Sequence, residues 1–201
     1  MVWIAISGID GAGKTTLLDF LHKHIRELGD VKRFKHPHFD WLREMLSLVG
    51  EDPYTDLLLF SSEIRCEMHL IREWTKKYKY LISQRCWLDH FPYRLTQGFS
   101  IEETYKLLSP SSFLVPDIVV YLRCDYKTAY NRIKGKRGDK YETLSFLRML
   151  EKNFDYVINE VEHKRLLPEF NATKILRIDS SGSIENTKSL LLEGLREYGL
   201  I

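Results

Sequence analysis

The sequence predicts an α/β fold, in which a parallel sheet of five strands has helices on both of its faces. Five short and nearly continuous apolar runs recur along the 201 residues, a pattern typical of strands that are buried on both faces. Stretches with helical spacing separate these runs, and this alternation indicates a parallel sheet covered by helices. We expect one domain, residues 1–201, because this length supports one well-buried core.

The strands are expected at residues 2–7, 31–35, 80–83, 118–122 and 174–178. The first helix follows the first strand as far as Leu28, where Gly29 stops it. Further helices are expected at about residues 41–49, from Asp52 or Pro53 to residue 77, and after the fourth strand. Since the strands are parallel, we expect ligands to bind at their carboxyl ends.

A glycine-rich segment joins the first strand to the first helix and matches the pattern G-x-x-x-x-G-K-[ST]. Its glycines let successive backbone N–H groups converge on phosphate oxygens, and the helix directs its positive dipole end at the same place. Lys14 supplies a charge for the β and γ phosphates, and the Thr15 hydroxyl is a ligand for Mg²⁺. We interpret the segment as a nucleotide-binding site built from Gly8, Gly11, Ala12, Gly13, Lys14, Thr15 and Thr16.

Composition argues against several other classes of protein. The 30 Lys and Arg against 28 Asp and Glu give a formal charge of +2 without a basic block, which disfavours a nucleic acid polymer as partner. The three cysteines are widely spaced and form no C-x-x-C pair, as in a protein of a reducing compartment. The apolar start is too short for a signal sequence, and no run approaches a membrane span. We therefore expect a cytoplasmic protein that does not enter the membrane.

Polar residues follow the second and third strands. Lys35 precedes His36 and Pro37 at the end of the second strand, where a phosphate contact and an ordinary solvated loop are both possible readings. Gln84 and Arg85 end the third strand, and an arginine there suits a bidentate grip on phosphate.

A basic segment follows the fourth strand. Five cations fall between Arg132 and Lys140, around two glycines. We interpret residues 133–142 as a short lid that brings positive charge onto a transferring phosphoryl group. The alternative is an exposed basic helix end that is stabilised by the helix dipole.

The long third helix carries an apolar stripe that is core or subunit contact. On this helix, Phe60 and Arg65 are candidates to face a ligand.

Taken in order, these motifs resemble the thymidylate kinases, a family of P-loop nucleoside monophosphate kinases, over nearly the whole chain. The resemblance rests on the opening SGIDGAGKTT, on LLLF at residues 57–60, on Gln84-Arg85, and on residues 116–122 and 178–185. It implies the P-loop kinase fold and phosphorylation of a deoxynucleoside monophosphate, foremost dTMP to dTDP, with ATP and Mg²⁺. It also implies a homodimer.

The resemblance assigns roles to single residues. It implies that Asp10 contacts the sugar hydroxyl of the acceptor, that Phe60 stacks on the base, and that Arg85 holds the acceptor phosphate, while Tyr93 matches a family tyrosine. The substrate-binding candidates are then Asp10, Lys35, Phe60, Arg65, Arg85 and Tyr93. The catalytic candidates are Lys14, Arg85, Arg132, Lys136 and Arg137, of which the last three resemble lid cations of the bacterial subtype.

Several positions depart from the family pattern. The departures are Ser7 for Glu, Gln84 for Asp, Asp89 for Ser, Arg94 for Gln, and Ile64 for a thymine-contacting arginine, with Arg65 one residue later. Because a phosphate acceptor needs no general base, Gln84 favours a monophosphate over a nucleoside. Two alternatives stay open. One is a kinase for another pyrimidine (deoxy)nucleotide or a nucleoside, and the other is a weakly catalytic nucleotide-binding paralogue.

Overall fold

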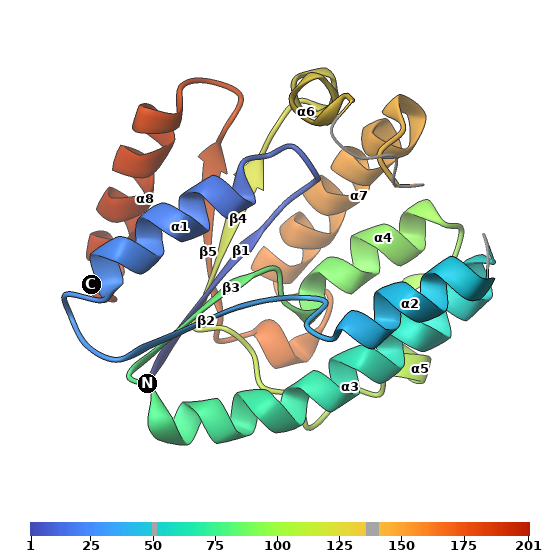
Figure 1. The fold of residues 1–201 in the computed structure, drawn as a ribbon, viewed down its shortest axis with the longest axis horizontal. Coiled ribbons are helices and arrows are strands. Elements are labelled where there is room, and N and C mark those ends of the chain that lie inside the picture. Colours follow the sequence, from blue (N-terminus) through green and yellow to red (C-terminus); the bar gives the residue numbers. More distant parts are fainter. Residues whose placement is uncertain (50–51, 136–140) are drawn as a thin grey trace.

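Five parallel strands form the central sheet of the computed structural model, in the order β2-β3-β1-β4-β5 (Figure 1). The structure describes residues 1–49, 52–135 and 141–201. The strands are β1 (Val2–Ser7), β2 (Val31–Lys35), β3 (Tyr80–Gln84), β4 (Ile118–Arg123) and β5 (Lys174–Asp179). The α/β fold class that the sequence predicted, with its parallel sheet, is confirmed.

Strand β1 lies in the middle of the sheet, where Ile6 pairs with Gln84 of β3 and with Val120 of β4. The strands β3, β4 and β5 each run one residue beyond the predicted end. The apolar pattern stops there, but the ladder continues through Gln84, Arg123 and Asp179. Gln84 therefore belongs to the sheet and pairs with Lys35 of β2.

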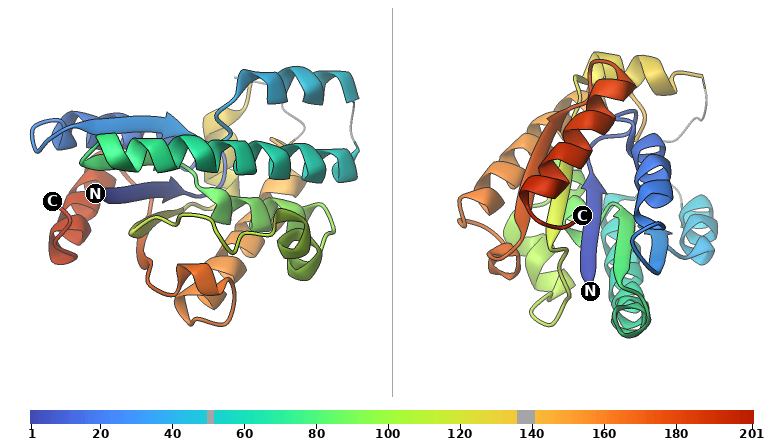
Figure 2. Two further views of the ribbon diagram at one scale, coloured as in Figure 1. Left: turned by 90° about the horizontal axis from the view of Figure 1, so that it is seen from below. Right: turned by 90° about the vertical axis from the view of Figure 1, so that its left-hand side faces the viewer.

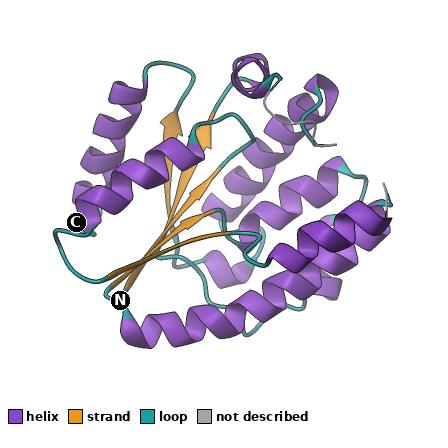
Figure 3. Cartoon of the chain, in the orientation of Figure 1, coloured by secondary structure: helices purple, strands orange, loops and turns teal. Residues whose placement is uncertain are grey.

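Helices cover both faces of the sheet (Figures 2 and 3). They are α1 (Lys14–Ile25), α2 (Asp40–Val49), α3 (Pro53–Lys77), α4 (His90–Thr96), α5 (Ile101–Leu108), α6 (Tyr126–Ile133), α7 (Leu144–Glu162) and α8 (Ile184–Glu197), with 3-10 turns at Trp87–Asp89 and Pro168–Phe170. Helices α1 and α8 pack together on one face, and α3 and α7 lie on the other, with α4 beside α7. Among the residues described, no helix is long and apolar enough to cross a membrane.

Local chemistry explains where the helices begin and end. Asp52 caps α3, since its carboxylate accepts from the N–H groups of Tyr54 and Thr55 at 3.3 and 2.9 Å. Helix α1 ends at Ile25 and not at Leu28 as predicted, because the Leu28 N–H turns back to the Ile25 carbonyl at 2.8 Å. Helix α6 ends at Ile133, where the Lys134 N–H donates to the Tyr130 carbonyl oxygen at 2.8 Å.

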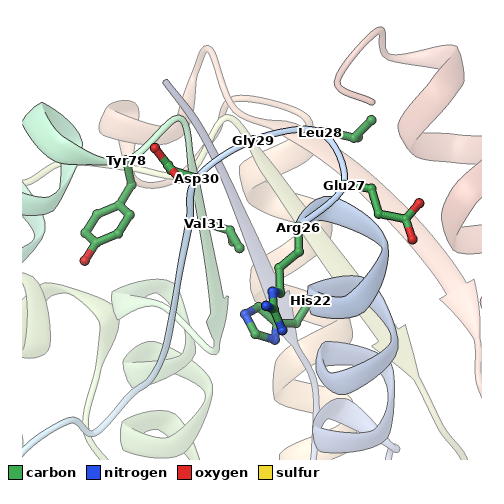
Figure 4. Close-up of a pocket in the computed structure, with 8 residues that line it drawn as sticks. All are labelled: His22, Arg26, Glu27, Leu28, Gly29, Asp30, Val31 and Tyr78. Carbon is green, nitrogen blue, oxygen red and sulfur yellow. The ribbon is translucent and has the colours of Figure 1, made fainter.

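An open pocket lies between the end of α1 and the start of β2 (Figure 4). Its lining residues are His22, Arg26, Glu27, Leu28, Gly29, Asp30, Val31 and Tyr78. Since Val31 begins β2 and Tyr78 precedes β3, this pocket lies at the amino ends of the strands. In a parallel sheet the functional site is expected at the opposite edge.

Candidate active site

The loop between β1 and α1 follows the carboxyl end of the central strand. The φ angles are 139° at Gly8, 87° at Gly11 and 94° at Gly13, values that residues with a Cβ rarely adopt. A Cβ at Gly8 would lie 2.6 Å from the Leu122 carbonyl oxygen, and one at Gly11 would overlap the backbone of Ala129. The glycines therefore let the loop pack closely against β4 and α6.

Lys14 turns its ammonium group back into this loop. Its Nζ donates to the carbonyl oxygens of Gly8 and Ile9 at 2.8 and 2.7 Å and lies 3.4 Å from Asp10 Oδ1. Burial, followed by the positive charge of Arg85, lowers the pKa of Lys14 to about 8. The charge is thus held in position by oxygens that a phosphate can replace.

Asp10, Arg85 and Tyr93 meet beside the loop. The Arg85 Nη2 donates to Asp10 Oδ1 at 2.5 Å, and the Tyr93 hydroxyl donates to Asp10 Oδ2 at 2.7 Å. Although burial raises the pKa of Asp10, the charges of Arg85 and Lys14 hold it well below its usual value. Burial raises the pKa of Tyr93 well above its usual value, so the hydroxyl keeps its proton.

Arg85 has a strained backbone and a partly unused guanidinium group. Its φ is 73°, a left-handed conformation that costs a residue with a Cβ about 1–3 kcal/mol. Among the residues described, nothing accepts a hydrogen bond from Nη1, which lies 3.7 Å from Asp89 Oδ1. One arm of the guanidinium group is therefore left for an anion.

Oxygen atoms gather around Thr15 and Ser7. The Thr15 hydroxyl donates to Gln84 Oε1 at 3.0 Å, and the Ser7 hydroxyl donates to Asp89 Oδ2 at 2.6 Å. Thr15 and Gln84 present neutral oxygens of the kind that Mg²⁺ accepts. The Asp89 carboxylate is buried and also accepts from the Cys86 N–H at 3.2 Å.

A second buried cluster, which the sequence analysis missed, joins β2 to α3. His36 Nδ1 lies 2.5 Å from Glu67 Oε2 and 3.5 Å from Glu63 Oε2. Glu63 also accepts from the backbone N–H groups of His38 and Phe39. Burial alone would lower the pKa of His36, but the charges of Glu67 and Glu63 outweigh this effect and raise the pKa to about 9. The cluster thus fixes the loop after Lys35 with an imidazolium between two carboxyl groups.

The His36 cluster predicts a pH-dependent stability. In the folded protein the pKa of His36 is about 9, above the ordinary 6.5. The contribution of His36 to the free energy of unfolding is therefore fully present below pH 6.5 and is lost as the pH rises through 9. We expect His36→Gln to lower the free energy of unfolding by about 3 kcal/mol at pH 6, and by much less at pH 10.

Urea unfolding at both pH values measures this difference. His69→Gln, at an exposed position of α3, the helix that carries Glu63 and Glu67, serves as the control and should show no such trend. A destabilisation by His36→Gln that is equal at both pH values would contradict the ionic role of His36.

The structure places the remaining candidates at different points. Phe60 is half-buried on α3, and Lys35 is the last residue of β2. Arg65 instead donates to the carbonyl oxygens of Leu108 and Ser109 at 2.7 and 3.1 Å, at the end of α5. This contact holds α5 against α3 and does not bring Arg65 to the Asp10 cluster.

Arg132 bridges the first loop and the loop after β5. Its Nη1 lies 3.4 Å from the Gly11 carbonyl oxygen, and its Nη2 donates to the Ser181 carbonyl oxygen at 3.2 Å. The catalytic candidates Lys136 and Arg137, and with them half of the predicted lid at 133–142, lie outside the described residues.

Known proteins match this chain over most of its length. The family described as Thymidylate kinase matches residues 6–190. A probable thymidylate kinase of Pyrobaculum aerophilum is 33% identical over 154 residues, which cover 74% of this chain and 78% of that protein. Probable thymidylate kinase 1 of Saccharolobus solfataricus is 27% identical over 188 residues, 87% of this chain and 96% of its own length.

A bacterial relative extends this agreement. Thymidylate kinase of Buchnera aphidicola subsp. Baizongia pistaciae is 28% identical over 205 residues, with 92% of this chain and 90% of that protein covered. The family match begins within β1 and ends within α8, and it includes the loop after β1 together with Arg85 and Tyr93. The chain therefore belongs to the thymidylate kinase family, whose members are nucleoside monophosphate kinases and thus phosphotransferases.

Proposed function

We propose that this protein transfers the γ-phosphoryl group of ATP to a deoxynucleoside monophosphate, with dTMP as the preferred acceptor and Mg²⁺ as the metal ion. The observation that carries the proposal is the cluster of Asp10, Arg85 and Tyr93 directly beside the phosphate-binding loop. A donor site and an anion-binding acceptor site thus share one edge of the sheet. The names of the relatives support dTMP as the acceptor.

The loop residues would hold ATP. The backbone N–H groups at Gly8, Gly11, Ala12, Gly13 and Thr16 and the amino end of α1 would face the phosphates. Lys14 would exchange its contacts with the Gly8 and Ile9 carbonyl oxygens for phosphate oxygens. The Thr15 hydroxyl and the Gln84 amide would hold Mg²⁺, which neutralises charge on the phosphates when it is bound.

The acceptor would occupy the other side of Asp10. Arg85 would bind its phosphate through Nη1, Asp10 and Tyr93 would contact its sugar, and Phe60 would stack on its base. Lys35, one strand further out, would add positive charge near the acceptor phosphate. Because this phosphate is already an anionic nucleophile, the site needs no general base.

Positive charge would reach the transferred group from the lid side. Arg132 already contacts the Gly11 carbonyl oxygen, and Lys136 and Arg137 follow within a few residues of the chain. Cations that neutralise the developing charge are the main catalytic requirement of phosphoryl transfer. We assign this role to the three residues together.

An acceptor panel tests the proposal. The protein is mixed with ATP, Mg²⁺ and, in turn, dTMP, dUMP, dCMP, dGMP and thymidine, and ADP release is followed. We expect the fastest release with dTMP and none above background with thymidine. Turnover with thymidine would favour a nucleoside kinase, and ATP binding without turnover on any acceptor would favour a nucleotide-binding paralogue.

The Gln84 position predicts how strongly Mg²⁺ is held. Gln84→Asp places a carboxylate beside the Thr15 hydroxyl, so we expect the Mg²⁺ concentration for half-maximal rate to fall several-fold. The control is Gln84→Asn, because asparagine has the length of aspartate without its charge. This variant should not lower the Mg²⁺ concentration for half-maximal rate. If both substitutions changed this Mg²⁺ concentration equally, the side chain at position 84 would not be a ligand of the metal ion.

A further inference from the structure

Arg94 is a buried cation whose hydrogen-bonding capacity is only partly used. Arg94 belongs to α4, and only 1% of its surface is exposed to solvent. Its guanidinium carbon lies 5.0 Å from the centre of the Phe60 ring. Among the residues described, no atom accepts a hydrogen bond from its Nε or its Nη1. Two donors of a buried charge are therefore left beside the half-buried ring.

The surroundings balance the charge of Arg94 but not these two donors. Asp56, one helical turn before Phe60 on α3, faces Arg94, as does Tyr141, and the Asp56 carboxylate also accepts from Gln97 Nε2 at 3.1 Å. Burial lowers the pKa of Arg94, although an arginine keeps its charge. Leaving donors of a buried charge without partners costs more than leaving a surface arginine in water. Such a group is retained most readily where a ligand supplies the missing acceptors.

Neighbouring side chains do not offer the same function. Arg65 is bound to carbonyl oxygens at the end of α5, and Ile64 is buried and apolar. The His90 ring centre is 6.5 Å from that of Phe60, and burial lowers the pKa of His90 well below its usual value, which leaves the ring neutral. Of the side chains that the structure describes, Arg94 is therefore the cation placed against Phe60.

We propose that Arg94 determines base specificity by donating hydrogen bonds to a carbonyl oxygen at the edge of the acceptor's base. The proposal rests on the proposed function, in which the base stacks on Phe60. A guanidinium group has donors only, so it pairs with the carbonyl oxygen at position 4 of thymine or uracil. The amino group at the same position of cytosine is itself a donor and would face Arg94 without a bond.

Arg94→Gln tests this assignment. An amide can rotate to donate to a carbonyl group or to accept from an amino group, so it should not separate the two bases. We expect the wild-type protein to favour dTMP and dUMP over dCMP by about 10- to 150-fold in kcat/KM, the range for a hydrogen bond to a charged group. In Arg94→Gln this ratio should fall to within about threefold, mainly through KM for dTMP.

Matched measurements separate specificity from folding. Arg94→Lys keeps the charge that faces Asp56 and should retain most of the preference, and Arg165→Gln, at an exposed position, should match the wild type. ATP affinity reports whether each variant is folded. If Arg94→Gln does not fold, the wild type is assayed with the dUMP analogue that lacks the oxygen at position 4, which should lose as much kcat/KM as dCMP does.

The outcomes separate the role of Arg94 from the kinase activity itself. An unchanged ratio of dTMP to dCMP in folded Arg94→Gln, or a wild type that accepts the analogue as well as dUMP, would overturn the role of Arg94 while the kinase activity stands. No turnover of any monophosphate by the wild type would instead overturn the proposed function, and the role of Arg94 with it.

Discussion

Replacing Lys14 with alanine is expected to lower kcat by at least about a hundredfold, the loss that follows removal of a preorganised charge contact. Three oxygens of the loop hold the ammonium group, so its position is fixed before a phosphate binds. The alanine variant keeps the loop but loses the ammonium charge that is proposed to face the transferred group. Steady-state ADP release at saturating ATP and dTMP measures the effect.

A lysine elsewhere on the same helix is the control for this substitution. Lys23 is exposed on α1, and Lys23→Ala should keep the wild-type kcat. A folded Lys14→Ala protein with kcat close to that of the wild type would show that this ammonium group does not take part in transfer.

Arg85→Ala is expected to lower kcat/KM for the acceptor by at least about a hundredfold. Its guanidinium group is oriented by Asp10 at 2.5 Å and has its Nη1 left for an anion. In the proposed site its loss would remove the group that binds and aligns the acceptor phosphate, whereas the residues proposed to hold ATP would stay in place. Initial rates at varied dTMP and varied ATP should therefore show a large change in KM for dTMP and a small one in KM for ATP.

The substitution Arg85→Ala also affects the stability of the folded protein, and a double variant controls for this effect. Alanine leaves the Asp10 carboxylate without its main counter-charge, and this destabilises the folded protein. The double variant Asp10→Asn with Arg85→Ala removes both charges and should recover stability but not activity. Equal losses in KM for dTMP and for ATP would place Arg85 outside the acceptor site.

Patterns along the chain predicted most of the fold because burial on both faces leaves a clear apolar signal. The run at residues 31–35 is β2 as expected, and the long helix ends at Lys77 as expected. The ends of β3, β4 and β5 were placed one residue early, since backbone pairing continues past the last apolar side chain. The end of α1 was wrong because a tight turn at Leu28 continues the helical spacing without the helix.

The candidate site was only partly accessible from sequence. The loop motif locates Lys14 and Thr15, and family resemblance adds Asp10, whose contact with Arg85 spans 75 positions of the chain. No local pattern shows that His36 meets Glu63 and Glu67. The two glutamates one turn apart on a buried helix face were the available signal.

Arg65 and Arg94 show why spacing alone does not locate a ligand group. Arg65 stands next to the expected position on α3, but its side chain reaches the end of α5. Arg94 comes from α4 and reaches Phe60 across the interface between two helices. The packing of α3 against its neighbours decides which arginine meets the ring, and that packing is not written in the spacing of either helix.

The most direct test of the proposed reaction follows the transferred phosphoryl group itself. The protein is incubated with ATP labelled at the γ-phosphoryl group, Mg²⁺ and dTMP, and the nucleotides are separated. We expect the label to move into dTDP, with equal amounts of dTDP and ADP formed. Label that appears only as inorganic phosphate, or stays in bound ATP while dTMP is unchanged, would contradict the claim that donor and acceptor phosphates meet between the loop and Arg85.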